Sequence, residues 1–338
     1  MKLIKSFSSV ALAATFAAAT FAAPAMAKNF KIAVGDSGGS SQEATGLAFK
    51  EKLEELSGGN HTATLFLNGQ LGSEQDTVNE AAIGTLDMSL LAINNVTPFS
   101  PTVGVFTLPY VILSLEDAET LTQGPIGQEL TENTINDAGV RIIAWTYTGF
   151  RVLTNSKKPV KSVADLEGLV IRVPKNEIMI DTYKAWGISP TPMAWSETFA
   201  GLQTKVVDGQ DNPYTTINAM KFYEVQDYVT EIRYIFSIEP LIISEQVFQG
   251  LSAEDQAAVL EAGQYATQAS AQFLRDKEAE IKALLVEKGM EIHVPENDEA
   301  EFIELATTAV WPKFYESIGG VEKLNAVLAA IGRDPVSE

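Results

Sequence analysis

Hydrophobic and polar positions alternate in blocks that predict an α/β fold. The run FKIAV (residues 30–34) predicts a buried strand, and a Gly/Ser-rich turn follows it. The next segment, Ser41 to Leu56, places its leucines and Phe49 on one helical face and ends before Gly58-Gly59, a helix-stop signal. The chain therefore opens with a predicted strand and a predicted amphipathic helix.

A second strand and helix repeat this order. HTATLFLN (61–68) alternates as a strand does, Ser73 to Ile83 predicts a helix closed by Gly84, and LDMSLLAI (86–93) predicts another buried strand. A strand–helix–strand–helix–strand order favours a parallel sheet, so this part predicts an α/β lobe. Loops at the carboxyl ends of such strands face a crevice. Here those loops are residues 36–41, 68–74 and 94–95.

The middle of the chain predicts a second lobe. Leu115 to Ala138 is helical with a break at Gly124-Pro125, and RIIAWTYTGFRVLTN (141–155) is a long β-type stretch with a kink at Gly149. We expect the chain to cross into the second lobe there and to return with PLIIS (240–244). Hinge strands would connect the two lobes. The predicted division is residues 28–148 with 238–275 in the first lobe and residues 149–237 with 276–338 in the second.

One long helix is predicted near the C-terminus. Residues 252–288 begin with a capping box at Ser252 and Asp255, and Gly263 is the only glycine before Gly289. At 1.5 Å per residue, a helix of this length spans roughly 55 Å, more than the width of one small lobe. We expect it to lie across both lobes.

The first 27 residues have the character of a signal peptide. Lys2 and Lys5 precede a short apolar run, and Ala25-Met26-Ala27 is an A-x-A cleavage pattern, so we expect cleavage after Ala27. The chain contains no Cys, which excludes disulfides and a lipid-anchored Cys. These features predict export to the periplasm without direct membrane insertion.

The charge balance is strongly acidic. Removing the predicted signal leaves 22 basic residues against 44 acidic ones, a formal charge of −22. Such a surface repels nucleic acid and anionic lipid, so neither is an expected partner. Bulk charge says little about a ligand, because the field in a pocket is set by the groups that line it.

The stretch from residue 168 to 213 contains groups suited to a small carboxylate. Arg172 lies within the apolar run LVIRVP, a predicted buried strand, and a buried guanidinium requires an anionic partner. Asn212 lies in GQDNP, which predicts a turn, and Trp195 precedes a predicted helix. A fixed cation, an amide and an aromatic face together favour a carboxylate-binding pocket. Each also has a structural interpretation: an internal ion pair, a turn amide and a core aromatic.

The order of these motifs resembles that of a known family. The chain resembles the DctP-type solute-binding proteins of tripartite ATP-independent periplasmic (TRAP) transporters in the order of four motifs: IRVP, PTPMAWSE, LQTKVVDGQDNP and KFYEVQDY. The likeness extends to NGQLGSEQD (68–76), GTLDM (84–88), TLPYV (107–111) and GFRVLTN (149–155). The resemblance covers nearly all of the chain after the signal. It implies a two-lobed periplasmic binding protein fold with hinge strands and a long helix spanning both lobes.

The resemblance also implies roles for second-lobe residues. Arg172 corresponds to the arginine that clamps the ligand carboxylate, and Asn212 to an Asn that contacts the same group. Arg151 corresponds to a position that often lines the site, although a structural ion pair at the hinge is an equal alternative. Trp195 corresponds to an aromatic against the ligand, and Tyr234 stands where relatives often have His.

First-lobe contacts follow from the crevice loops. These candidates are Asp36, Gln70, Glu74 and Asn95. Sialic-acid binders of this family carry an acidic residue after the strand that resembles GTLDM, whereas this chain has Ala92 and Ile93. That departure argues against sialic acid as the ligand.

Catalytic and metal motifs are weak. GDSGG (35–39) matches the nucleophile motif of trypsin-like proteases, but no His precedes Ser37 in the chain, so a triad is not expected. Two isolated His and no Cys predict no metal site. No phosphate-binding glycine loop follows a strand, and we expect no cofactor and no catalytic residues.

The sequence therefore predicts a periplasmic TRAP solute-binding protein. We expect a monomer that captures an organic acid, such as a uronate, an aldonate or another hydroxy-carboxylate, and delivers it to membrane transporter subunits. A C4-dicarboxylate remains an alternative, because Arg151 supplies a candidate second cation. An exported enzyme acting on carbohydrate acids and an ABC-type binding protein are the alternatives from other classes.

Overall fold

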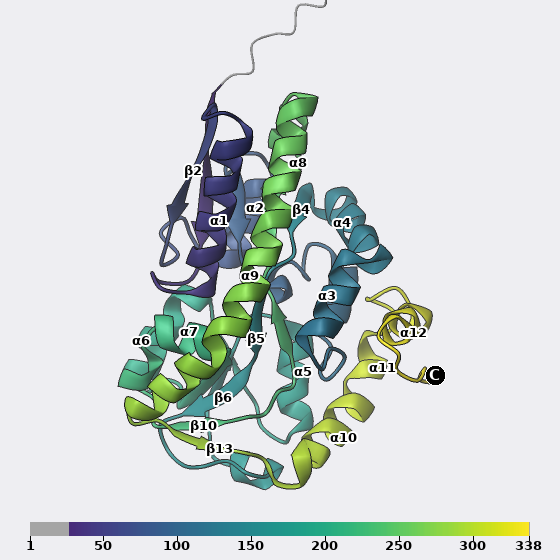
Figure 1. Cartoon of the computed structure of the whole chain (residues 1–338). Helices are drawn as coiled ribbons and strands as arrows, with labels where there is room; N and C mark the ends of the chain where they lie inside the picture. The colour runs from purple at the N-terminus through teal and green to yellow at the C-terminus, as the bar shows by residue number, and fades with distance from the viewer. Residues whose placement is uncertain (1–26, 338) are drawn as a thin grey trace, which may run out of the picture.

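Two β-sheets, one in each half of the molecule, organise the computed structural model, which describes residues 27–337 (Figure 1). The sheet of the first lobe has the order β2-β1-β3-β12-β4. Strand β1 runs parallel to β2 and β3, whereas β12 runs antiparallel to β3 and β4. The strands are β1 (Lys28–Val34), β2 (His61–Phe66), β3 (Met88–Leu90), β12 (Leu241–Ser244) and β4 (Val140–Ala144).

The sheet of the second lobe has the order β13-β10-β6-β9-β7-β8. Its central strand β9 pairs antiparallel with β6 and parallel with β7. The strands are β13 (Glu291–His293), β10 (Tyr228–Thr230), β6 (Val152–Asn155), β9 (Gly209–Asn212), β7 (Ile171–Val173) and β8 (Thr191–Pro192).

Helices cover both faces of the first-lobe sheet. Apolar side chains of α1 and α9 form one core with the sheet, and those of α2, α3 and α4 pack in the core on its other side. The helices are α1 (Ser41–Leu56), α2 (Glu74–Ala82), α3 (Leu115–Gln123), α4 (Pro125–Ala138) and α8 (Glu245–Gln249). The bounds predicted for residues 41–56 are those observed. Ser73 caps α2, and Pro125 begins α4 after the predicted break.

The second lobe carries shorter helices around its sheet. They are α5 (Glu177–Ala185), α6 (Trp195–Gln203) and α7 (Tyr214–Ala219). The C-terminal part adds α10 (Ala300–Ala309), α11 (Trp311–Phe314) and α12 (Val321–Ala330). Helix α10 packs against α5, whereas α12 packs against α3 of the first lobe. The predicted lobe boundaries remain a prediction, and the packing of α12 argues against placing its residues in the second lobe.

A two-stranded ribbon lies between the sheets. Strand β5 (Tyr147–Phe150) pairs antiparallel with β11 (Phe236–Ile238), so the outgoing and returning crossings run side by side. Gly149, at φ +104°, is in a conformation that favours glycine, and a Cβ there would meet the Glu278 carboxylate at 2.9 Å. These crossings are where hinge strands were expected.

Helix α9 (Ala253–Glu287) spans both lobes, as the sequence predicted (Figure 1). It has 35 residues and begins at Ser252, whose side chain accepts from the Asp255 N–H. The helix packs on α1 and β4 in the first lobe and on α7 in the second. At Gly263 it lies so close to β4 that an added Cβ would be 2.0 Å from the Ile143 carbonyl oxygen.

The expected turn at GQDNP is wrong. Residues 209–212 form β9, an interior strand of the second sheet, and all four are buried. Gly209 is required by close packing, since its Cβ would lie 2.1 Å from the Thr154 carbonyl oxygen. The side chains of this strand are polar and contact other polar groups. The sequence therefore lacks the alternation of apolar and polar residues by which a strand is usually recognised.

Two further findings concern membranes and signals. No helix within residues 27–337 has the length and apolar character needed to cross a bilayer. The predicted signal peptide and its cleavage pattern fall on residues 1–27, of which the first 26 lie outside the described part of the chain.

Candidate functional site

A cavity lies between the two lobes. Both sheets and the crossing segments contribute polar side chains to it. Its lining residues are Asp36, Gln42, Glu74, Ala92, Asn94, Asn95, Arg151, Arg172, Pro174, Trp195, Asn212, Thr216 and Glu239. A neighbouring cavity shares Glu74, Asn95, Arg172, Pro174 and Trp195 with it and reaches Lys175.

A larger groove occurs elsewhere, along β4 between α4 and α9. Its one arginine, Arg141, forms a bidentate pair with Glu245 at 2.7 and 2.8 Å. The charged side chains of this groove are thus already paired with an opposite charge or exposed to solvent. The interlobe cavity is the better candidate site because it gathers buried charges in a concave space.

Arg172 is the central charge of the cavity. The side chain comes from β7, is 2 % exposed, and donates from Nε and Nη2 to the Met193 carbonyl oxygen at 3.1 and 2.8 Å. Its guanidinium lies 5.5 Å from the centre of the Trp195 ring. Within residues 27–337, no carboxylate oxygen lies within salt-bridge distance of it. Burial, followed by repulsion from Arg151, lowers the pKa of Arg172 to about 10.

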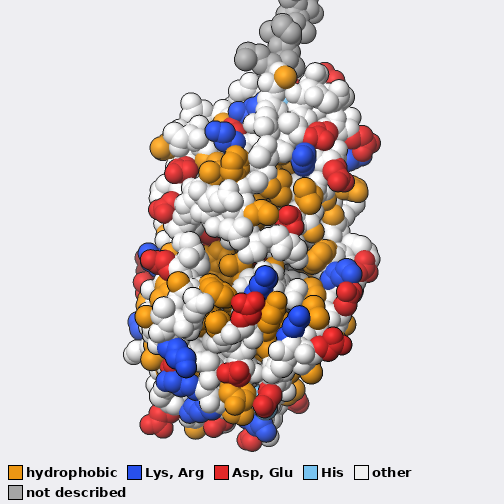
Figure 2. Space-filling view, turned by 90° about the vertical axis from the view of Figure 1, so that its left-hand side faces the viewer, with side chains coloured by type: hydrophobic (Ala, Val, Ile, Leu, Met, Phe, Trp, Pro, Cys, Tyr) orange, Lys and Arg blue, Asp and Glu red, His pale blue; other side chains and the backbone are white. Residues whose placement is uncertain are grey.

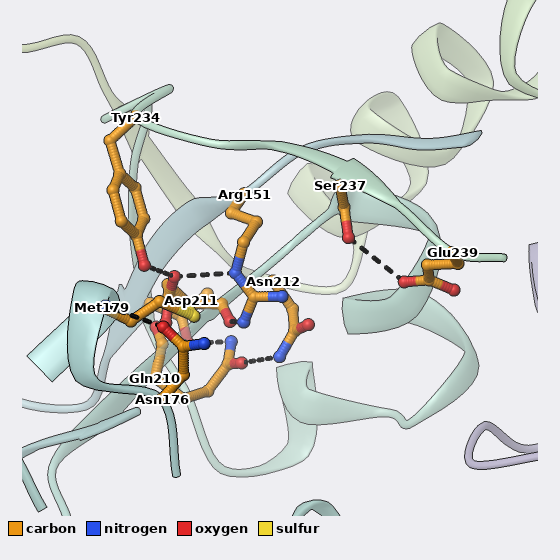
Figure 3. A network of polar contacts seen from close by, with 10 residues as sticks. Arg151, Asn176, Met179, Gln210, Asp211, Asn212, Tyr234, Ser237 and Glu239 are labelled. Carbon is orange, nitrogen blue, oxygen red and sulfur yellow. Dashed lines mark hydrogen bonds and ion pairs between the residues drawn. The ribbon is translucent and has the colours of Figure 1, made fainter. Parts of the chain in front are cut away.

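Arg151 has the partner that Arg172 lacks. Its Nε donates to Asp211 Oδ2 at 2.8 Å, and its Nη2 donates to the Asp211 carbonyl oxygen (Figure 3). Burial alone lowers the pKa of Arg151, but the Asp211 carboxylate outweighs it and raises that pKa overall. The structural ion pair that the sequence left open is therefore present, although Arg151 also lines the cavity.

Tyr234 lies behind this ion pair. Its hydroxyl donates to Asp211 Oδ2 (Figure 3). Its ring packs edge-on against Tyr183 and Trp186. Tyr234 is 1 % exposed and does not line the cavity. The geometry supports a role in orienting Asp211 and gives no support to the expected ligand contact.

Asn212 and Trp195 are placed on the cavity wall by adjacent elements. Asn212 ends β9, and its amide Nδ2 donates to Gln210 Oε1 at 2.5 Å (Figure 3). Trp195 is the first residue of α6, and its indole lies close to Gly35 of the first lobe, where an added Cβ would meet it at 2.9 Å. Both residues come together with Arg172, as the sequence predicted for the pocket.

Three carboxylates from the first lobe and the returning crossing complete the wall. Asp36 accepts from Thr216 Oγ1 at 3.2 Å, and Glu239 accepts from Gln42 Nε2 at 2.9 Å and from Ser237 Oγ at 3.2 Å. Glu74 accepts from the Ala92 N–H at 3.3 Å and from the Asn95 amide. Burial first, and then repulsion between the acids, raises the pKa of Asp36 and brings that of Glu74 to about 7. Burial also raises the pKa of Glu239.

The two lobes touch across the cavity. The bond from Thr216 to Asp36 joins α7 to the loop after β1, and Asn176 Nδ2 donates to the Asn94 carbonyl oxygen at 2.9 Å. Gln75 Nε2 donates to the Lys175 carbonyl oxygen at 2.9 Å. The cavity is thus enclosed by first-lobe and second-lobe groups that bond to each other.

Sequence reasoning placed Asp36, Glu74 and Asn95 on this wall but also named Gln70, which is exposed in the loop after β2 and does not line the cavity. It missed Gln42, Thr216 and Glu239 as lining residues, and it placed Asn94 on a crevice loop without naming it as a ligand contact. A signal for Glu239 was present, because a lone acid inside the apolar run FSIEPLIIS requires partners for the same reason as Arg172. The GDSGG serine, Ser37, donates to Asn68 Oδ1 at 2.6 Å, which agrees with a structural loop.

Comparison with known proteins gives consistent results. A family model described as bacterial extracellular solute-binding protein, family 7 (DctP), matches residues 34–318. A solute-binding protein of Roseobacter denitrificans is 37 % identical over 270 residues, which are 80 % of this chain and 82 % of that one. The crystal structure of that protein as a TRAP periplasmic solute-binding protein with bound L-galactonate covers 91 % of this chain and 100 % of its own, at 32 % identity and a TM-score of 0.84. A TRAP periplasmic solute-binding protein of Polaromonas sp. JS666, bound to D-erythronate, covers 89 % of this chain and 98 % of its own, at 30 % identity and a TM-score of 0.84.

Proposed function

The chain belongs to family 7 of the bacterial extracellular solute-binding proteins, the DctP family of TRAP periplasmic solute-binding proteins, and from this premise we propose that its ligand is a sugar acid held by Arg172. Proteins of this family bind their solute and do no chemistry on it, which sets aside the enzyme alternative. Family membership also sets aside the ABC-type alternative. The protein serves a TRAP transporter, and its delivery of the ligand to the membrane subunits is part of this proposal.

The observation that carries the proposal is the unpaired charge of Arg172. A cation that is almost fully buried without a carboxylate partner is costly, and an incoming carboxylate would remove that cost. The guanidinium presents Nη1 and part of Nη2 beyond the bonds to Met193. Asn212 lies beside it on the same wall and supplies an amide for the same carboxylate. The Trp195 ring would cover the ligand from one side.

The polarity of the cavity wall favours a hydroxylated acid. This wall has few apolar groups and many hydrogen-bonding ones, which suits a chain or ring of hydroxyls. Relatives support this chemistry: solved structures at 32 % and 30 % identity hold L-galactonate and D-erythronate. We propose an aldonate or a uronate for this chain on these grounds.

Capture would proceed by closure of the lobes. The open form would bind the carboxylate on the second-lobe residues Arg172 and Asn212, and first-lobe groups would then close on the hydroxyls. The bonds that already join the lobes, such as that from Thr216 to Asp36, would be made on closure. The ligand would stabilise the closed form because it contacts both walls at once.

A thermal-shift screen of residues 28–338 against sugar acids, dicarboxylates, neutral sugars and amino acids tests this proposal. A ligand present at 100 times its dissociation constant adds about 2.7 kcal/mol to the free energy of unfolding. We expect the hits to be aldonates or uronates, with titration calorimetry giving one site. Stabilisation by neutral or cationic compounds alone would refute the sugar-acid assignment and leave the family unaffected.

A further inference from the structure

The two walls of the interlobe cavity carry opposite charge. Its arginines, Arg151 and Arg172, come from the second lobe. The facing wall carries the acids Asp36 and Glu74 of the first lobe and Glu239 of the returning crossing. We call these three residues the acidic wall. On the outer face seen in Figure 2, by contrast, acidic and basic side chains are interspersed.

Only one cationic position in this cavity is available to a ligand. Asp211 already neutralises Arg151, with its Oδ2 2.8 Å from Nε. Arg172 is therefore the one lining cation without a carboxylate partner among the residues that the structure describes. Lys175 lines the neighbouring cavity, but it is exposed to solvent at that position. One ligand carboxylate can be neutralised inside, and a second would have to face other groups.

The groups that a second carboxylate would face are acids held by neutral donors. Asp36, Glu74 and Glu239 accept from amides, hydroxyls and a backbone N–H, and none forms a salt bridge in the described part of the chain. A carboxylate has about four acceptor positions, so each retains capacity for a ligand hydroxyl. Burial raises the pKa of all three, and repulsion from neighbouring acids adds to this for Asp36 and Glu74, so further negative charge at this wall is disfavoured.

An amide on the same wall lacks a partner. Asn94 is 5 % exposed and lines the cavity, yet its Nδ2 makes no hydrogen bond. A buried donor without an acceptor is unusual in a folded protein and indicates a group supplied from outside. A ligand hydroxyl both donates and accepts hydrogen bonds. It can therefore donate to a carboxylate of this wall and accept from the Asn94 amide.

We propose that the acidic wall selects ligands with a single carboxylate, accepting the hydroxyls of an aldonate or uronate and rejecting aldarates and C4-dicarboxylates. This inference rests on the proposed sugar-acid function and specifies how the end of the ligand opposite its carboxylate is recognised. Asp36, Glu74 and Glu239 are then specificity-determining residues that act by repulsion. A like charge placed against such a wall would weaken binding by roughly a hundredfold or more.

Matched ligand pairs test this selection directly. L-Galactonate and galactarate differ only in the oxidation of the terminal CH₂OH to a carboxylate, as do D-gluconate and D-glucarate, and D-erythronate and meso-tartrate. Titration calorimetry at pH 8, where the ligand carboxylates are ionised, gives the ratio of dissociation constants within each pair. For each pair that binds, we expect the monocarboxylate to bind at least about a hundredfold more tightly, because only it avoids the acidic wall.

Variants then assign the selection to the wall. Glu239→Gln and Asp36→Asn should each reduce the ratio severalfold, chiefly by strengthening the dicarboxylate, because each removes one repelling charge while keeping the size of the side chain. Lys175→Gln is the control and should leave the ratio unchanged. A fold check by circular dichroism and melting accompanies each variant, and the wild-type ratio remains decisive where a variant does not fold.

Each outcome is informative. A wild-type ratio near one, or a preference for a dicarboxylate, overturns the selection by the acidic wall while the sugar-acid function stands. A high ratio that falls in Lys175→Gln but not in the wall variants assigns selection to the cavity mouth and also overturns it. Failure of all six compounds to bind refutes the proposed sugar-acid function for aldonates of these kinds, and the inference about the acidic wall fails with it.

Discussion

The Arg172→Ala substitution separates a ligand clamp from a structural arginine. Most buried arginines are held by an internal acid, and their removal destabilises the fold by leaving that acid unpaired. Arg172 has no such acid within salt-bridge distance in the described chain, and burial already lowers its pKa to about 10. Removing its charge should therefore affect binding far more than folding.

The magnitude follows from the donors that remain. A guanidinium has five N–H groups. Two of them are directed to the Met193 carbonyl oxygen, through Nε and Nη2, which leaves enough for two bonds to a ligand carboxylate. Hydrogen bonds to charged groups contribute about 1.5–3 kcal/mol each, so the loss is about 4 kcal/mol, or roughly a thousandfold in the dissociation constant.

Stability of the ligand-free protein should change little. The substitution removes two bonds to Met193 and the contact with Trp195, but it also removes the free energy cost of a buried unpaired cation. We expect the melting temperature to stay within about 3 °C of wild type. Arg172→Lys retains the charge without the planar fork and should lose binding by an intermediate factor.

The assay is titration calorimetry with the tightest sugar acid from the screen, together with melting of the ligand-free variants. Arg275→Ala is the matched control, because Arg275 forms a surface pair with Glu119 at 2.7 Å, far from the cavity, and should bind as wild type. The clamp is refuted if Arg172→Ala binds within about threefold of wild type. A large fall in the melting temperature of that variant would instead identify Arg172 as a structural residue.

Three further predictions concern the surroundings of the site. Arg151→Met should lower the free energy of unfolding by about 3–5 kcal/mol in denaturant melts, because it leaves the Asp211 carboxylate buried without its cation. Gly263→Ala should lower it by about 1–3 kcal/mol, since the new Cβ would be 2.0 Å from the Ile143 carbonyl oxygen, and Ala at an exposed helix position would be the reference. The pKa of Glu74 is raised to about 7 by burial and by Glu239, so the closed form binds a proton more readily than an open form in which Glu74 is hydrated. Raising the pH through 7 should therefore shift the ligand-free protein toward the open form in small-angle scattering, and an unchanged radius between pH 5 and 8 would contradict this linkage.

The regular elements were largely predictable, because their signals are local. Ser73 caps α2 and Ser252 caps α9 by accepting from the N–H of the residue three positions ahead. Such a spacing can be recognised in the sequence itself. The break at Gly124-Pro125 separates α3 from α4 for the same reason. The strand at residues 209–212 was not predictable in this way, since its polar side chains are satisfied by groups distant in sequence.

The site shows the same division. The sequence predicted a buried Arg172, because the apolar run LVIRVP around it is typical of a buried strand, and the side chain is 2 % exposed. Only the tertiary structure decided which arginine has an internal acid as partner: Asp211 lies 60 residues from Arg151 in the chain and neutralises it, and no acid does so for Arg172 in the described part. Likewise, Glu239 and Gln42 are separated by 197 residues and meet only because the returning crossing lies against the first lobe. Burial and capping depend on neighbours in the chain, whereas charge pairing depends on neighbours in space, and the fold alone supplies those.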